Sequence, residues 1–388
     1  EPDGRIYSDS GNAIFNCMLR MGVTTAVGGN CGLSCCNPAD YLDLVDRDGA
    51  AVNVAMLAGH AWFREHAGAT DRYGRTTAAQ RAQMHEEIAD CLRRGCFGVS
   101  YGIRYVPGLD EEELLETASP CRDYGRLIAA HIRSDADEVF DSERELLEIG
   151  RRLGIPVQVS HIGSMAGFGQ MEEFLRIADE YRLRGLDVSC DCYPYDAFST
   201  SIGSATYDDG WMERYGCSYD AVELCEGKYK GQRCTEAIFN EVRSGHPECL
   251  TVCYVMREDD VDRAFAHPNV MLASDGILSH GQGHPRAAGA FPRFLSQYAR
   301  RGKLSLYDAI SRMTAMPAAR LGLTSKGCLR VGADADAVIF DPDSIMDCAD
   351  FQHPVCAPTG IDRVLIGGVT AVEKGCIVQN DLGRSIRK

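Results

Sequence analysis

Two short apolar runs that each end in a histidine decide the fold: Ile128-Ala129-Ala130-His131 and Val157-Gln158-Val159-Ser160-His161. The two histidines are thirty residues apart, and a helix-like stretch long enough to cross back over a parallel sheet separates the runs. If both runs are neighbouring strands of a β/α barrel, both imidazoles emerge at the same rim, where such barrels keep their catalytic groups. The pair therefore predicts a functional site at the carboxyl ends of parallel strands.

Short apolar runs alternate with longer amphipathic runs through most of the sequence, as they do in βα units. Seven candidate strands are one fewer than a closed barrel needs, and the missing strand is expected to be the first. The sequence predicts an α/β protein, a distorted TIM (β/α)8 barrel whose first strand is absent from this sequence. The expected strands are Val23–Gly28, Ala51–Leu57, Cys96–Tyr101, Leu127–His131, Pro156–His161, Leu186–Cys192 and Val270–Asp275, and helices are expected at Ala78–Arg94, Glu111–Asp123, Asp137–Leu153 and Met171–Leu183.

Two regions break this alternation. Residues 205–250 carry few apolar repeats and are expected to form a lid-like insertion over the barrel mouth. An extra strand, Leu250–Val255, is expected to follow it. Beyond Gly322 the sequence changes to short strands with glycine turns. We therefore expect a barrel domain over residues 1–325 and a small β appendage over residues 326–388.

Composition excludes several classes of protein. The 388 residues include 56 acidic and 40 basic side chains, so the net charge of −16 argues against nucleic acid and anionic membranes as partners. No apolar run reaches the roughly 20 residues of a membrane span, and the first residues do not resemble a signal peptide. The 18 cysteines are scattered through apolar runs, which favours reduced thiols and a cytoplasmic protein. The sequence leaves open whether identical chains assemble into a homo-oligomer.

Cys31, in Gly29-Asn30-Cys31-Gly32, and Asp275, in Ala273-Ser274-Asp275-Gly276, also end apolar runs. With His131 and His161 they place metal-compatible groups on four strand ends. Imidazole nitrogen and thiolate sulfur suit Zn²⁺, and three protein ligands with one open position are typical of catalytic zinc. A carboxylate near that position can take a proton from water and return it to a leaving nitrogen. The pattern indicates a metal-dependent hydrolase, with Asp275 as the candidate acid and base.

Short motifs in a fixed order make the sequence resemble the N-acyl-D-amino-acid deacylases (D-aminoacylases) of the amidohydrolase superfamily. Each motif alone is weak, whereas the ordered set is specific and spans about residues 20–342. The motifs are Gly22–Gly32, His131-Ile132-Arg133-Ser134, Ser160-His161, Asp191-Cys192-Tyr193-Pro194-Tyr195, Ser274-Asp275-Gly276, His284-Pro285-Arg286, Thr314–Ala318 and Gly332–Asp336.

The resemblance implies a barrel carrying a small β-sandwich. It also implies zinc-dependent cleavage of the amide in an N-acyl-D-amino acid, and this amide is a C–N bond other than a peptide bond. It implies that Cys31, His131 and His161 hold Zn²⁺ and that Asp275 shuttles the proton. Tyr105 and Arg286 would engage the small-molecule substrate, and Ser199 is a weaker candidate for a substrate hydrogen bond. Arg286 makes physical sense because guanidinium binds a carboxylate through two hydrogen bonds.

The sequence departs from the family pattern at two places. No histidine precedes His60, so the His-x-His motif of the first barrel strand and its second metal site are absent, and we expect a longer parent protein. The lysine that the family commonly shows two residues after the second barrel histidine is replaced by Gly163. Substrate preference is therefore open. Arg104, expected to be exposed beside Tyr105, is a hypothetical source of preference for acidic substrates.

Two other functions compete with deacylation. One is a cyclic-amide hydrolase related to dihydroorotase or hydantoinase. The absence of a lysine on a strand end before His131 counts against it, because those enzymes bridge two metals with a carboxylated lysine. The other is a non-catalytic relative that uses the barrel for binding.

Three other histidines are not assigned to the metal site. His60 is interpreted as structural, and His280 and His284 are interpreted as residues near the barrel mouth.

Overall fold

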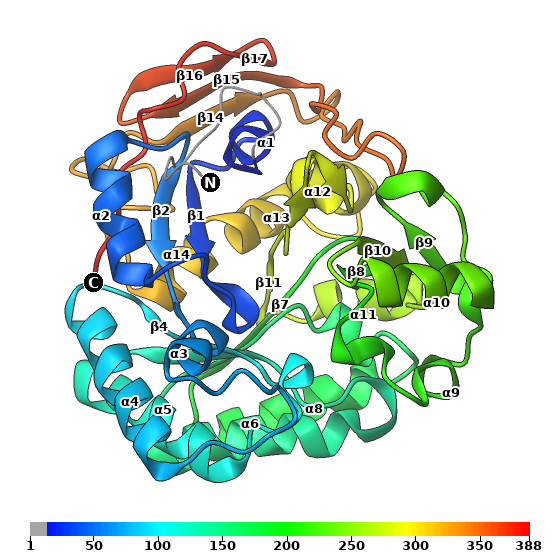
Figure 1. The fold of residues 1–388 in the computed structure, drawn as a ribbon. Helices are drawn as coiled ribbons and strands as arrows, with labels where there is room; N and C mark the ends of the chain where they lie inside the picture. The colour runs from blue at the N-terminus through cyan, green and yellow to red at the C-terminus, as the bar shows by residue number, and fades with distance from the viewer. Residues whose placement is uncertain (1–13) are drawn as a thin grey trace.

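The computed structural model describes residues 14–388 and places parallel strands at the centre with helices outside them (Figure 1). Six strands form one sheet in the order β11-β7-β6-β5-β4-β3, and β1 pairs with β2 in a second parallel sheet. Only Leu57 separates β2 from β3, so the two sheets follow one another around the barrel. The strands are β1 (Thr25–Gly28), β2 (Asn53–Met56), β3 (Ala58–Gly59), β4 (Gly98–Gly102), β5 (Leu127–His131), β6 (Val157–Val159), β7 (Val188–Cys192) and β11 (Val270–Leu272).

These bounds confirm the predicted barrel architecture and all seven predicted strands, with β3 as an unpredicted continuation of β2. Every residue of β4 and β5 is buried, as expected for strands covered on both faces. The helices that follow the strands include α2 (Pro38–Asp48), α3 (His60–His66), α4 (Ala78–Arg93), α5 (Glu111–Tyr124), α6 (Val139–Leu153), α7 (Gly163–Ala166), α8 (Met171–Leu183), α11 (Glu258–Ala266), α13 (Leu306–Met313) and α14 (Ala315–Leu321).

Local sequence explains why these helices begin and end where they do. Thr77 caps α4 through a capping box with Gln80, which satisfies amide groups that the first turn leaves free. Gly154 ends α6 in the left-handed conformation that glycine adopts at low cost. α8 has the predicted bounds, and α6 begins two residues later than predicted because a 3₁₀ turn at Ala136–Glu138 precedes it.

Two strands that were predicted to end in a functional side chain end before it. β6 ends at Val159 rather than His161, and β11 ends at Leu272 rather than Asp275. His161 and Asp275 have φ angles of 36° and 48°, which lie outside the β region. The backbone therefore leaves the sheet just before each functional side chain, a feature that an apolar pattern does not reveal.

Residues 205–250 form a compact unit with helices and a strand of its own. Its helices α9 (Trp211–Tyr215) and α10 (Glu236–Gly245) and its strand β9 (Val222–Leu224) accompany an antiparallel sheet in the order β8-β10-β9. β8 (Phe198–Ser201) and β10 (Leu250–Cys253) flank this insertion, so the extra strand predicted at Leu250–Val255 is present. Trp211 stacks on Phe239 with ring centroids 5.3 Å apart, which gives the unit an aromatic core. The few apolar repeats in this part of the sequence did not predict this aromatic core.

The C-terminal region contains a four-stranded antiparallel sheet in the order β14-β15-β16-β17 (Figure 1). Its strands are β14 (Ala337–Phe340), β15 (Ile361–Ile366), β16 (Val369–Glu373) and β17 (Cys376–Ile377), and the remaining elements are α1 (Ile14–Arg20), α12 (Arg286–Phe294) and the hairpin β12–β13 (Leu278–Ser279, Gln282–Gly283). The chain then returns to the barrel, where Gly383 pairs with Ala50 and Ser385 pairs with Val54 of β2. The division at residue 325 stays a prediction, and residues 1–13 lie outside the described part.

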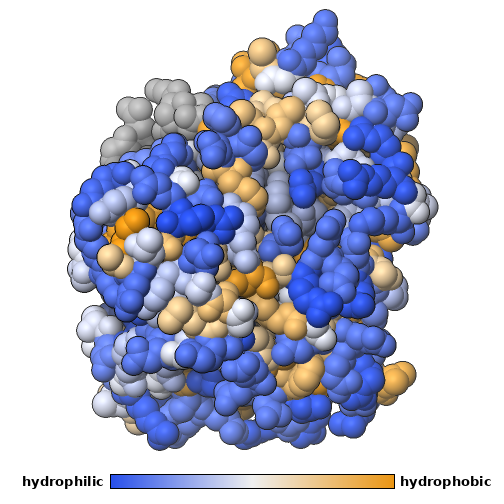
Figure 2. All heavy atoms as spheres, turned by 90° about the vertical axis from the view of Figure 1, so that its right-hand side faces the viewer, coloured by the Kyte–Doolittle hydropathy of each residue, from blue (hydrophilic) through white to orange (hydrophobic). Residues whose placement is uncertain are grey.

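The face that carries the insertion is largely hydrophilic (Figure 2). Among the helices of residues 14–388, none combines the length and the apolarity of a membrane span.

Candidate metal centre and active site

Cys31, His131 and His161 meet at the rim of the barrel. One ligand atom from each lies within 4.8 Å of the others, and the Cys31 sulfur is 3.0 Å from Nε2 of His161. The rings of His131 and His161 have centroids 4.7 Å apart. β5 and β6 are parallel neighbours, which brings the two predicted histidines together.

The loop after β1 places Cys31. Its φ of 53° is left-handed, which is uncommon for a residue with a side chain. The loop docks on the end of β4, where the Ser100 hydroxyl accepts from the amide of Gly32 at 3.0 Å and donates to the Gly29 carbonyl. A Cβ on Gly102 would lie 2.3 Å from the Cys31 carbonyl oxygen, so only glycine allows this approach.

His131 has both ring nitrogens engaged. Nε2 lies 2.8 Å from Oδ1 of Asp135, and Nδ1 lies 3.2 Å from the hydroxyl of Tyr105. A carboxylate on one ring nitrogen fixes the tautomer and leaves the other nitrogen for a metal. Nδ1 is therefore the nitrogen of His131 that a metal would take.

His161 is held in the form that a metal needs. Burial lowers the pKa of its imidazole to about 4, so the ring is neutral at physiological pH. The Ser164 hydroxyl lies 3.1 Å from Nδ1, which leaves Nε2 facing Cys31. Asp191 accepts a hydrogen bond from the backbone amide of His161 at 2.7 Å. Burial raises the pKa of Asp191 to about 6.

One thiol and two imidazoles are the donors that Zn²⁺ prefers, and three protein ligands match a catalytic site. Burial raises the pKa of the Cys31 thiol, and the neighbouring Asp275 and Asp191 carboxylates act in the same direction. A dication would displace that proton and bind the thiolate. Within residues 14–388 no other trio of histidine, cysteine or acidic side chains meets these distances. The residues fit zinc.

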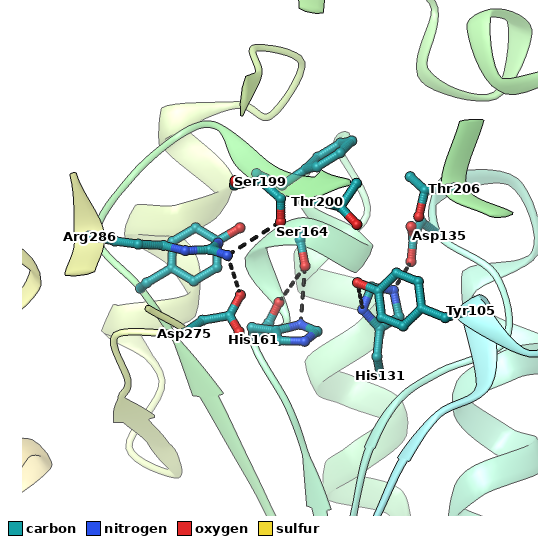
Figure 3. A pocket seen from close by; sticks show the side chains of 12 residues that line it. Tyr105, His131, Asp135, His161, Ser164, Ser199, Thr200, Thr206, Asp275 and Arg286 are labelled. Atoms are coloured by element: carbon teal, nitrogen blue, oxygen red, sulfur yellow. Dashed lines mark hydrogen bonds and ion pairs between the residues drawn. The ribbon is translucent and has the colours of Figure 1, made fainter. Parts of the chain in front are cut away.

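A cavity opens above the two histidines (Figure 3). Asp275 and Arg286 form one end of it, with Nη2 of Arg286 2.8 Å from Oδ2 of Asp275. Tyr105, Asp135 and Thr206 lie at the other end (Figure 3). The lining residues are Tyr105, His131, Asp135, His161, Ser164, Tyr193, Phe198, Ser199, Thr200, Thr206, Asp275 and Arg286.

Arg286 is a buried cation with spare donors. Its side chain is 2 % exposed, yet Nε and Nη1 have no hydrogen-bond partner. The guanidinium stacks over the Tyr193 ring at 4.5 Å. Ser199 has a buried hydroxyl without a partner on the same cavity wall. Unsatisfied buried donors are costly, and the donors on this wall remain available to an acceptor.

The structure brings all seven predicted site residues to one place, six on the cavity wall and Cys31 against His161. Their roles stay predictions. Arg104 is not the exposed residue that we expected, because Nη2 is 3.2 and 3.4 Å from the carbonyl oxygens of Ala205 and Thr206. His60 is buried 3.0 Å from Glu113, His284 is buried against the Ala197 carbonyl, and His280 is exposed.

Sequence reasoning missed Asp135, Ser164 and Tyr215. Asp135 lies four residues after His131, a spacing that could have suggested it as a partner of that histidine. Nothing in the sequence connects Tyr215 to the site. The glycine that replaces the family lysine has a packing reason, since a Cβ on Gly163 would lie 3.0 Å from Cys192 Sγ and from Met256 Cε. Neither of these neighbours lines the cavity.

A parallel barrel that gathers a thiol, two imidazoles and a carboxylate at its rim has the architecture of a metal-dependent hydrolase. The Amidohydrolase family matches residues 243–372. The chain is 32% identical to a D-aminoacylase from Alcaligenes xylosoxydans xylosoxydans, over 95% of this chain and 82% of the relative. It therefore belongs to the D-aminoacylase family.

Comparisons with solved structures agree with this family assignment. An N-acyl-D-glutamate deacylase from Bordetella bronchiseptica, complexed with zinc and a phosphonate mimic of the tetrahedral intermediate, superposes with a TM-score of 0.87. It is 30% identical, over 98% of this chain and 86% of that one. A D-hydantoinase superposes with a TM-score of 0.58 at 15% identity, over 97% of this chain and 83% of that one, and shares the fold alone.

Proposed function

We propose that this protein is a zinc-dependent amidohydrolase that cleaves the amide bond of N-acyl-D-amino acids. The observation that carries the proposal is the buried Arg286, which lines the same cavity as His131 and His161 and has two donors without a hydrogen-bond partner. A carboxylate for the guanidinium and an amide for the metal are the two groups that every N-acyl amino acid offers.

Cys31, His131 and His161 would hold the zinc. Bound zinc supplies Lewis acidity, which polarises a carbonyl oxygen and eases the deprotonation of water. Asp135 and Ser164 fix the ring nitrogens that face away from the donor set, so both imidazoles are oriented before a metal binds.

Arg286 and Ser199 bind and orient the substrate. Nε and Nη1 have no hydrogen-bond partner while Nη2 stays on Asp275, so the guanidinium keeps donors for a substrate α-carboxylate. Burial removes competition from water, which strengthens this ion pair. The Ser199 hydroxyl supplies a further hydrogen bond. With a glycine at position 163, Arg286 is the cation on the cavity wall that meets the carboxylate.

Asp275 and Tyr105 handle the proton and the developing charge. Asp275 takes a proton from water as the oxygen adds to the acyl carbon, and returns it to the amide nitrogen as the C–N bond breaks. Burial raises the pKa of Tyr105, so its hydroxyl stays protonated and can donate to the acyl oxygen. The products are a carboxylic acid and a free D-amino acid.

The cytoplasm is the compartment that we propose, because all 18 cysteines are free of disulfides. We also propose the division into a barrel (1–325), with its insertion at 205–250, and an appended β region (326–388).

The test is a panel of N-acetyl-D-amino acids, their L-enantiomers, a D-hydantoin and dihydroorotate, with release of free amine or ring opening as readout. We expect hydrolysis of the D-series alone. Ring opening alone would favour the cyclic-amide hydrolase. A zinc-loaded protein that turns over none of them would favour a binding protein.

Asp275→Asn provides the control within the site. It keeps the size of the side chain but removes the base, so we expect kcat to fall by roughly 10²- to 10⁴-fold. Unchanged kcat would contradict the proton-transfer role.

A further inference from the structure

A buried hydrogen-bond chain connects the insertion to the metal centre. The Tyr215 hydroxyl, on α9, donates to Oδ2 of Asp135 at 2.8 Å. Oδ1 of the same carboxylate is 2.8 Å from Nε2 of His131. These hydrogen bonds therefore connect Tyr215, inside the insertion, to the His131 imidazole at the end of β5.

The groups of this chain are enclosed, so each hydrogen bond has consequences. The exposed fractions are 4% for His131, 2% for Asp135 and 7% for Tyr215. A carboxylate that lost a partner in such a place would remain buried with an unsatisfied oxygen, which is costly. Asp135 therefore depends on both neighbours, one from the barrel and one from the insertion.

The directions of the hydrogen bonds support the same arrangement. The Tyr215 hydroxyl donates to Oδ2 of Asp135, and the N–H at Nε2 of His131 lies on Oδ1 of the same carboxylate. Burial raises the pKa of Tyr215, so its oxygen keeps the proton that it donates. With Nε2 directed at Asp135, Nδ1 is the ring nitrogen of His131 that is left for a metal.

The Tyr215 side chain is held in place by aromatic packing. Its ring packs on Phe168 and Phe198, with centroids 5.2 and 5.4 Å away. Glycines 210 and 216 bound α9 in left-handed conformations, which fixes where the helix begins and ends. Phe198 also lines the cavity, so the packing of Tyr215 is continuous with the site.

We propose that Tyr215 is a positioning residue through which the insertion orients His131 as a zinc ligand. The hydroxyl locks the Asp135 carboxylate, and the carboxylate locks the imidazole with Nδ1 directed at the donor set. The insertion is therefore part of the metal centre as well as a wall of the cavity. This inference rests on the zinc site of the proposed function, and not on the identity of the substrate.

Tyr215→Phe tests the inference by removing one oxygen atom. We expect its zinc dissociation constant, measured by competition with a chromogenic chelator, to rise by about 10-fold or more, as for other partners of metal-bound histidines. The absorption spectrum of the cobalt-substituted protein is expected to change, because the ligand geometry changes.

Tyr207→Phe is the matched control. Tyr207 lies in the same insertion, is 2% exposed, and its hydroxyl is 2.8 Å from Thr251 Oγ1 rather than from the metal centre. We expect it to lower thermal stability while leaving the zinc dissociation constant unchanged. Equal zinc affinities of the wild type and both variants would overturn the inference.

A double-mutant cycle keeps the test decisive even if Tyr215→Phe loses stability. Asp135→Asn alone should weaken zinc binding, and adding Tyr215→Phe should weaken it little further, since both changes break one chain. Fully additive losses would contradict the inference. A wild-type protein that binds no zinc would instead contradict the zinc site of the proposed function.

Discussion

Arg286 is the residue in which stability and function conflict most clearly. A guanidinium that is 2 % exposed and has two donors without partners costs free energy in the folded protein. Asp275 and the Tyr193 ring offset part of that cost. A carboxylate bound to these donors would offset the rest, as the proposed function expects.

Arg286→Lys should therefore damage binding more than chemistry. Lysine keeps the charge but loses the forked donors and the ring stacking. We expect KM for an N-acetyl-D-amino acid to rise about 30-fold, equivalent to about 2 kcal/mol. Arg293→Lys is the matched control, because Arg293 stacks on Tyr195 from the same helix outside the cavity. Equal KM values for the two variants would contradict the role of Arg286.

A second prediction at the scale of single residues concerns Glu143 and the dependence of folding stability on pH. Its carboxylate is buried without a hydrogen-bond partner, and burial raises the pKa of the side chain well above its usual value. The folded protein thus binds this proton more tightly than the unfolded chain, so the stabilisation is present below the unfolded pKa of about 4.3 and lost as pH rises through the folded pKa.

Glu143→Gln should remove this loss. The difference in Tm between variant and wild type should grow in favour of the variant from pH 5 to pH 8. Glu148→Gln, on the exposed side of the same helix, should show no such growth, since an Arg151 hydrogen bond holds the pKa of Glu148 low. A constant difference for Glu143→Gln across this range would refute the account.

Strand ends rather than strands create the site. β1, β6 and β11 each deliver their functional side chain from a left-handed residue just beyond the strand: Cys31, His161 and Asp275. Such conformations cost of order 1–3 kcal/mol each and persist where surrounding contacts hold them. For Cys31 those contacts come from the end of β4, at Ser100 and Gly102.

Gly102→Ala should therefore disturb the metal centre from a distance. The new methyl group would lie 2.3 Å from the Cys31 carbonyl oxygen and 2.6 Å from Tyr105 Cδ2, so the loop must move. We expect a loss of stability of about 3 kcal/mol and weaker zinc binding. Gly245→Ala, where nothing lies within 4 Å, should change neither. Unaltered zinc affinity in Gly102→Ala would show that the loop is not held at β4.

The strands and the turns that follow them differ in how well the sequence predicts them. Alternation of apolar and amphipathic runs located the barrel strands, and residue chemistry selected Cys31, His131 and His161. The left-handed turns at His161 and Asp275 were invisible because they depend on contacts across strands. The link from Tyr215 to Asp135 was equally hidden, since it joins residues 80 positions apart that meet only in the folded protein.

At the scale of the whole molecule, the last residues of the sequence return to the barrel. The final residues bond to Ala50, which precedes β2, and to Val54 within β2, and the Lys388 amide donates to the Gly95 carbonyl. An uncovered strand edge exposes unpaired backbone groups and favours aggregation. The last residues therefore cover an edge of the barrel.

Deletion of residues 383–388 should destabilise the barrel. Five backbone hydrogen bonds disappear, to Ala50, Val54 and Gly95, each contributing about 1 kcal/mol. We expect a lower Tm and concentration-dependent aggregation. Arg387→Ala isolates the charge contribution: Arg387 pairs with Asp43 and Asp46 near the surface, and we expect its loss to cost less than about 1 kcal/mol. If both proteins lose the same stability, backbone pairing is not the cause.

Zinc content per chain, measured by elemental analysis, tests the central claim most directly. We predict about one zinc per chain in the wild type, loss of zinc in His131→Ala, and retention in His280→Ala, whose histidine is exposed away from the donor set. Equal zinc in all three proteins, or none in the wild type after incubation with zinc, would contradict a metal centre at Cys31, His131 and His161.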